Sequence, residues 1–162
     1  MTNTWYATGG LLGVDLTTPT SDAKHKLGTI VHGNGQTEWV YVKATTALTQ
    51  YDVVAVNGSH EAAPASSTLA AQGYTPASAQ VAFTVNYYGW VARRGTGLRV
   101  RTAASTVKDS RLLIGTTGNS NGVVGTTSAS GSIALNGVVT VATAASAGVK
   151  PASVWNAPWF TP

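Results

Sequence analysis

Four Asn-Gly pairs constrain the fold of this chain more than any other feature, because each marks a candidate tight turn. A type I′ turn requires positive φ at both central residues, and Asn followed by Gly adopts it most readily. Most of the pairs lie between short runs rich in β-branched residues, which is the pattern of a β-hairpin. The sequence therefore predicts a chain built of antiparallel hairpins. The four pairs are Asn34-Gly35, Asn57-Gly58, Asn121-Gly122 and Asn136-Gly137.

The spacing of the turn signals predicts the architecture. They recur roughly every 8–15 residues, which is typical of sandwiches and barrels rather than βαβ units. We expect an all-β fold, a compact antiparallel barrel or sandwich of about nine short strands with extended N- and C-terminal arms. Residues 133–135 and 138–142 are expected to be separate strands, and Gly95-Thr96-Gly97 a turn between two others. Residues 66–72 predict a short helix of about two turns.

Alternation within two segments predicts how their strands are buried. In residues 38–44, Trp39 and Tyr41 alternate with Val40 and Val42, so both faces are apolar. We expect this strand to be covered by the core on one side and by an arm or a neighbour on the other. In residues 98–101, apolar residues alternate with arginines, which predicts a strand with a charged outer face.

The chain divides into a central domain and two arms. Its 162 residues suffice for one domain with its own core. We assign residues 1–26 to an N-terminal arm, 27–149 to the β-barrel or sandwich domain, and 150–162 to an extended C-terminal arm. Three prolines in the last segment favour an extended path without ladder hydrogen bonds.

Large aromatic residues occur in both arms. Each buries about 150–250 Å² when it packs, and several left exposed would promote aggregation. Two alternatives remain open: the arms fold back over their own barrel, or they lie in grooves of a neighbouring subunit, where extended segments bind through backbone pairing and aromatic anchors. The candidate anchors are Trp5, Tyr6, Trp155, Trp159 and Phe160.

Basic residues concentrate in residues 93–111, which hold six of the ten Lys and Arg residues and one acidic residue. This segment is interpreted as a solvated strand face, as a contact for an acidic protein surface, or as a nucleic-acid site with Tyr87, Tyr88 and Trp90 stacking on bases. Direct nucleic-acid contact is the least favoured, because no phosphate-binding glycine loop accompanies it. The candidate partner contacts are Arg93, Arg94, Arg99 and Arg101.

Reactive residue types do not cluster in the sequence. There is no Cys, and the three His residues follow no metal-ligand spacing. Ser59, His60 and Glu61 are adjacent, but sequence neighbours point in different directions and no Gly-x-Ser-x-Gly motif is present. We predict a non-enzymatic protein with no catalytic, cofactor-binding or metal site.

Charge is scarce along the whole chain. Charged residues make up 10% of it, against roughly 25% in ordinary soluble domains. Such a surface is suited to being covered by other chains. No apolar run approaches the length of about 18 residues that indicates a transmembrane helix, and no secretory signal is visible. We expect synthesis in a cytoplasm and no contact with a membrane.

Several stretches together resemble tailed-bacteriophage head decoration (capsid cement) proteins. The resemblance is one of pattern and composition over roughly residues 27–145, with no diagnostic motif. It lies in Leu27-Gly28-Thr29, in the Trp39-Val40-Tyr41-Val42-Lys43-Ala44 run, in Tyr51-Asp52-Val53-Val54, in Tyr88-Gly89-Trp90-Val91-Ala92 followed by Gly95, and in a late glycine-rich strand pair.

The resemblance implies a structural virion protein that binds the outside of an expanded icosahedral capsid. Such proteins often sit as trimers where they clamp neighbouring major capsid protein subunits against the pressure of packaged DNA. It implies the major capsid protein and other copies of this chain as partners, and a virion protein made in the bacterial cytoplasm. The alternative is a carbohydrate- or receptor-binding β module of a phage tail or a secreted protein, with Trp39, Tyr41, Tyr87, Tyr88 and Trp90 stacking on sugars.

Overall fold

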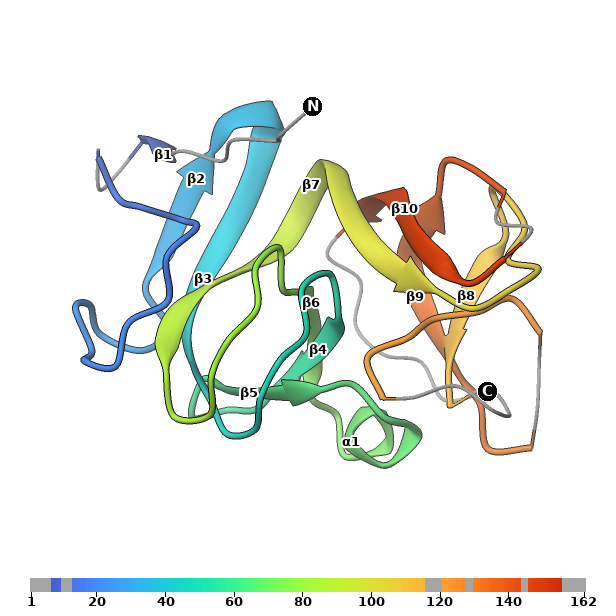
Figure 1. The fold of residues 1–162 in the computed structure, drawn as a ribbon, viewed down its shortest axis with the longest axis horizontal. Helices are drawn as coiled ribbons and strands as arrows, with labels where there is room; N and C mark the ends of the chain where they lie inside the picture. The colour runs from blue at the N-terminus through green and yellow to red at the C-terminus, as the bar shows by residue number, and fades with distance from the viewer. Residues whose placement is uncertain (1–6, 10–12, 116–120, 128–129, 144–145, 156–162) are drawn as a thin grey trace.

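The computed structural model describes residues 7–9, 13–115, 121–127, 130–143 and 146–155 (Figure 1). Within them the chain is nearly all β, which confirms the predicted fold class. The strands are β1 (Ala7–Gly9), β2 (Ile30–Gly33), β3 (Thr37–Ala44), β4 (Val53–Val56), β5 (Glu61–Pro64), β6 (Thr75–Ser78), β7 (Tyr88–Thr102), β8 (Arg111–Ile114), β9 (Ile133–Thr140) and β10 (Gly148–Trp155).

The strands form a single sheet that closes into a barrel. The sheet order is β1-β2-β3-β5-β4-β6-β7-β10-β9-β8, and a further pairing of β3 with β7 closes the circuit β3-β5-β4-β6-β7. The β1–β2 pair extends from β3, and the β10-β9-β8 group extends from β7. Figure 1 shows β7 crossing from the barrel to this second group, so one long strand joins the two parts of the molecule.

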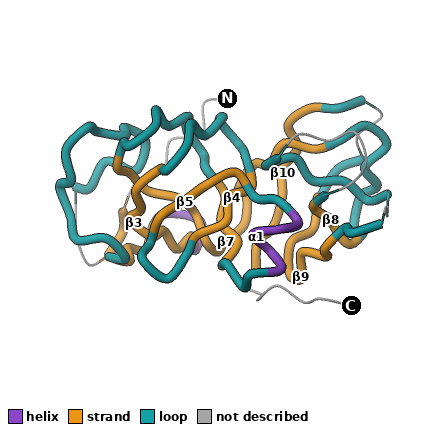
Figure 2. The backbone as a smooth tube through the Cα atoms, turned by 90° about the horizontal axis from the view of Figure 1, so that it is seen from below, coloured by secondary structure: helices purple, strands orange, loops and turns teal. Residues whose placement is uncertain are grey.

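The helix predicted from the sequence is present as α1 (Ser67–Ala71). The Leu69 N–H donates to the Ser66 hydroxyl at 3.3 Å, so Ser66 caps the first turn. Gly73 follows with φ of +79°, a conformation that ends a helix at little cost for glycine. The helix contacts β9 and lies between the barrel and the β8–β10 group (Figure 2).

Both faces of β3 are buried, as the sequence predicts. Trp39 and Tyr41 belong to one buried cluster and Val40 and Val42 to another. Part of the predicted N-terminal arm covers the first face: Leu16 is 1% exposed within the same cluster as Trp39. Residues 13–26 therefore pack on the barrel.

Two of the four Asn-Gly pairs make the predicted hairpins. Asn34-Gly35 lies in the short 3-10 turn between β2 and β3. Asn57-Gly58 lies between β4 and β5, where the Asn57 carboxamide oxygen accepts the Ser59 and Glu61 N–H groups. The Asn57 side chain thus stabilises the turn by accepting hydrogen bonds from two backbone N–H groups.

The prediction of a hairpin at Asn136-Gly137 is wrong. β9 runs through this pair without reversing, so the two strands expected on either side of it are one. The register with β8 slips here, because Leu112 pairs with Leu135 whereas Arg111 pairs with Val139. The Asn-Gly pair thus lies at a register irregularity between β8 and β9 rather than at a turn between two strands. The Asn121-Gly122 pair is likewise no hairpin: Gly122 accepts the Val53 N–H and donates to the Ala65 carbonyl.

Gly95-Thr96-Gly97 is not a turn, contrary to expectation, but lies inside the 15-residue strand β7. Gly95 has φ of +131°, and a Cβ there would lie 2.8 Å from the Thr37 Cα. The registers with β3 and with β10 both slip close to this point. Glycine is therefore needed where β7 bends from one partner strand to the next.

The predicted start of the C-terminal arm at residue 150 falls inside β10, which pairs with both β7 and β9. Pro151 lacks an N–H, yet it stands opposite Arg99 in the ladder, and its carbonyl oxygen accepts the Val141 N–H at 3.1 Å. The expectation that these residues lack ladder hydrogen bonds is therefore wrong for 150–155, because a proline carbonyl can still accept one.

Candidate functional site

The outward surface of the β7–β10–β9 sheet is the best candidate for a partner contact. Directly opposed residues of antiparallel strands point to the same side, and Pro151 pairs with Arg99 while Val149 pairs with Arg101. Leu98, Val100 and Ala152 alternate with them and are buried, so the other side faces the core. We call the following set the outer face: Arg99, Arg101, Arg111, Val139, Val141, Val149 and Pro151.

The outer face is apolar and cationic together. Val141 is 46% exposed and Val149 is 40% exposed, which is unusual for valines in a paired region. Arg111 is exposed at the rim, and no carboxylate lies within ion-pair distance of it in the part of the chain that the structure describes. An apolar patch with unneutralised arginines fits a partner that is partly apolar and acidic.

Two of the arginines contact Tyr51 and Asp52, the residues just before β4. The Arg101 guanidinium pairs with the Asp52 carboxylate at 2.6 Å, and Asp52 is 2% exposed. The Arg99 guanidinium lies 5.9 Å from the centre of the Tyr51 ring. The charge of Arg101 is thus largely neutralised inside the molecule, whereas Arg99 keeps its charge for an external contact.

The other two predicted contact arginines lie nearer the barrel. Arg93 pairs with Glu38 on the neighbouring strand at 2.9 Å. Arg94 is exposed and stands between Glu38 of β3 and Trp155 of β10 in the ladder. The four arginines therefore do not form one patch: the structure separates Arg93 and Arg94 from Arg99 and Arg101 by the bend at Gly95.

Most of the predicted aromatic anchors lie outside the described residues. These are Trp5, Tyr6, Trp159 and Phe160. Trp155 ends β10, where its backbone pairs with that of Arg94. Four residues of the outer face were not predicted as contacts, although the alternation of residues 138–141 and 149–152 could have indicated their common side: Val141, Val149, Pro151 and Arg111.

The flat sugar-stacking face of the alternative prediction is not formed. Trp39, Tyr41 and Trp90 are at most 3% exposed, and Tyr87 and Tyr88 are half-buried. The burial follows from the two-sided packing of β3 and of the β7 segment paired with it. Aromatic residues do, however, line a pocket beside the barrel.

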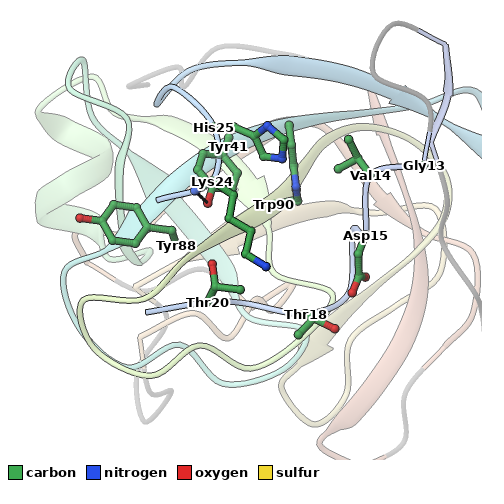
Figure 3. Close-up of a pocket in the computed structure, with 10 residues that line it drawn as sticks. All are labelled: Gly13, Val14, Asp15, Thr18, Thr20, Lys24, His25, Tyr41, Tyr88 and Trp90. Atoms are coloured by element: carbon green, nitrogen blue, oxygen red, sulfur yellow. Dashed lines mark hydrogen bonds between the residues drawn. The ribbon is translucent and has the colours of Figure 1, made fainter. Parts of the chain in front are cut away.

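This pocket has a volume of about 460 Å³ and lies between residues 13–25 and the barrel (Figure 3). The rings of His25, Tyr41 and Trp90 form its inner wall, with centroids 4.9–5.3 Å apart. Lys24 and Asp15 line its more exposed parts. The segment that carries Lys24 is attached to the barrel by a hydrogen bond, because the Lys24 backbone N–H donates to the Tyr41 hydroxyl at 3.0 Å.

Asp15 stands ionised at the edge of the pocket. The hydrogen bond from the Thr18 side chain, together with bonds from the Thr17 hydroxyl and the two backbone amides, lowers the pKa of Asp15 from its ordinary value of 3.8, while burial opposes this effect. The carboxylate thus holds the loop of residues 15–18 in place and adds negative charge at one side of the pocket.

Groups for other chemistry are not assembled in the described residues. Among them, no three His, Cys, Asp or Glu side chains lie close enough to hold a metal ion. No helix in the same residues is long and apolar enough to cross a membrane.

Comparison with known proteins identifies no relative from which a role could be transferred. No family model matches the chain, and no curated protein sequence matches it.

Proposed function

We propose that this chain is a structural virion protein that decorates the outside of a bacteriophage capsid and binds across junctions between major capsid protein subunits. The observation that carries the proposal is the outer face, where Val141 and Val149 are 46% and 40% exposed on the side of the sheet to which Arg99 and Arg101 belong. The resemblance of residues 27–145 to decoration proteins supplies the identity of the partner. The low charge of the chain supports a surface that is covered in use.

In the proposed mechanism the outer face buries its valines and proline against the capsid, and its arginines meet acidic groups there. Burying apolar surface across a junction raises the free energy needed to separate the subunits, by roughly 25 cal/mol for each Å² buried. Binding at many equivalent sites of an icosahedral shell makes a modest affinity at each site sufficient. A trimer of the chain would place three such faces around a threefold position.

The proposal is tested by adding purified protein to capsids that lack it, sedimenting the particles and measuring bound copies by gel densitometry. Wild type should co-sediment at hundreds of copies per capsid, as about one copy per capsid protein junction requires. Val149→Asp should reduce binding at least about tenfold, because a buried unpaired carboxylate opposes the apolar contact.

The matched control is Val85→Asp. Val85 is 47% exposed, similar to Val149, but belongs to the loop before β7 rather than to the outer face. Both variants should retain the circular dichroism spectrum of the wild type. Equal binding by the two variants would remove the outer face from the proposal, and absence of wild-type protein from the particles would reject the decoration function.

The predicted aromatic anchors of the C-terminal arm are tested with a separate deletion variant. Removing residues 150–162 would delete most of β10, so loss of binding would report unfolding of the sheet. Removing residues 156–162 leaves β10 intact and takes away Trp159 and Phe160. If these are anchors, this shorter deletion should weaken attachment while the melting temperature stays within a few degrees of wild type.

A further inference from the structure

The pocket of Figure 3 contains a hydrogen-bond donor, the Trp90 indole N–H, that is accessible from the pocket and has no acceptor among the described residues. Trp90 is 3% exposed, and its indole N–H makes no hydrogen bond within the described residues. Its nitrogen faces the open space of the pocket rather than the barrel core (Figure 3). An indole N–H can only donate a hydrogen bond, so it needs an acceptor from whatever occupies the pocket. A bound acceptor at this position would satisfy the Trp90 N–H.

A cation lies on the same side of that space. The Lys24 side chain extends into the pocket (Figure 3), and no carboxylate lies within 4.0 Å of its ammonium group in the described part of the chain. Its backbone is held by the Tyr41 hydroxyl, so the base of the side chain is fixed. A single acceptor group that is anionic would pair with both the ammonium and the indole N–H.

The other residues that line the pocket favour a ligand with several hydroxyl groups over a small inorganic anion. Thr18 and Thr20 provide hydroxyls, and the Asp15 carboxylate can accept hydrogen bonds from ligand hydroxyls. The half-buried Tyr88 ring offers an apolar surface on another side. The volume of about 460 Å³ lies in the range of small-molecule sites. The negative charge of Asp15 disfavours a ligand that is anionic at both ends.

We propose that this pocket binds a small hydroxylated carboxylate, of which a hexuronic acid is the simplest example. The carboxylate lies between the Lys24 ammonium and the Trp90 indole N–H. The hydroxyls lie toward Thr18, Thr20 and Asp15, and the ring lies against Tyr88. This site is separate from the outer face, and its existence does not depend on attachment to a capsid.

The test is a titration of the ¹⁵N-labelled full chain with glucuronate, followed through the indole N–H resonance of Trp90. That resonance is assigned by its disappearance in Trp90→Phe. Glucose carries the ring without the carboxylate, and acetate carries the carboxylate without the ring. Glucuronate should shift the Trp90 resonance saturably, and both comparison ligands should bind at least about tenfold more weakly, since a hydrogen-bonded charged group is lost or the ring contacts are absent.

Lys24→Gln should weaken glucuronate binding at least about tenfold. Lys26→Gln is the matched control, because Lys26 is also exposed but does not line the pocket, and it should bind like wild type. Lack of a saturable shift with glucuronate would overturn the proposal, as would equal binding of glucose or acetate. Unchanged affinity in Lys24→Gln would overturn it too, and that exposed position leaves the fold intact even if Trp90→Phe does not fold.

Discussion

Replacing Asp52 by Ala should strongly destabilise the protein, because this carboxylate ties the β4 region to β7 from a buried position. One oxygen accepts the Arg101 guanidinium at 2.6 Å and the other accepts the Thr49 N–H at 2.9 Å. Removing one partner of a fully buried ion pair costs about 3–5 kcal/mol. The Arg101 side chain is 31% exposed and can rehydrate, which lowers this cost. The lost bond to the Thr49 N–H adds about 1 kcal/mol.

Together these effects predict a loss of about 3 kcal/mol in the free energy of unfolding. With a urea dependence of about 2 kcal/mol per M, the midpoint of urea unfolding should fall by about 1.5 M. Tryptophan fluorescence follows the transition. Asp109→Ala is the control, because the Lys108–Asp109 pair is 3.6 Å apart with side chains 55% and 68% exposed, and it should stay within about 0.5 kcal/mol of wild type. A loss below about 1 kcal/mol for Asp52→Ala would refute the reasoning.

Three further predictions concern single positions. Gly95→Ala should lower the free energy of unfolding by at least about 2–3 kcal/mol, because φ of +131° and the Thr37 backbone leave no room for a Cβ. Urea unfolding measures this loss, and a neutral effect would show that the bend of β7 does not require glycine. Asn57→Ala removes three hydrogen bonds of the β4–β5 turn and should lower the free energy of unfolding by about 1–3 kcal/mol, which a thermal melt would show as a lower melting temperature. The depressed pKa of Asp15 stabilises the fold above pH 3.8 and loses this effect as the carboxylate is protonated below it, so the stability gap between wild type and Asp15→Asn should close in acid melting experiments; a gap that widens in acid would contradict the sign.

Local patterns predicted the fold class and several elements, because the forces that set them act over a few residues. The Trp39–Val42 alternation predicted a strand buried on both faces, and the structure confirms it. Residues 66–72, between Pro64 and Gly73, predicted a short helix, and the structure has one at Ser67–Ala71 with Ser66 as its cap. In each case the relevant contacts follow from strand or helix periodicity alone.

Other elements depended on partners that are remote in sequence. Glycine at 95 is compatible with a turn or with a bend in a continuous strand, and only the approach of Thr37 decides between them. The Asn136-Gly137 pair is compatible with a hairpin or a bulge, and the choice depends on the register between β8 and β9. The same applies to Pro151, whose carbonyl finds a partner in the loop after β9.

The candidate surface was predictable only in part for the same reason. The sequence placed Arg99 and Arg101 on one side of a strand, and the structure agrees. It could not indicate that Asp52 neutralises Arg101, because the two residues are 49 positions apart. Nor could it indicate that Val149 and Pro151 lie beside these arginines, since that depends on the pairing of β7 with β10.

The central proposal is tested most directly by counting copies of this protein in purified phage particles from cells that produce it. Gel densitometry against the major capsid protein gives that number. The decoration function predicts hundreds of copies per particle, because every equivalent junction of the shell is occupied. A count of about a dozen or fewer would instead indicate a vertex or tail component, and a protein that stays entirely in the soluble fraction would contradict a virion role.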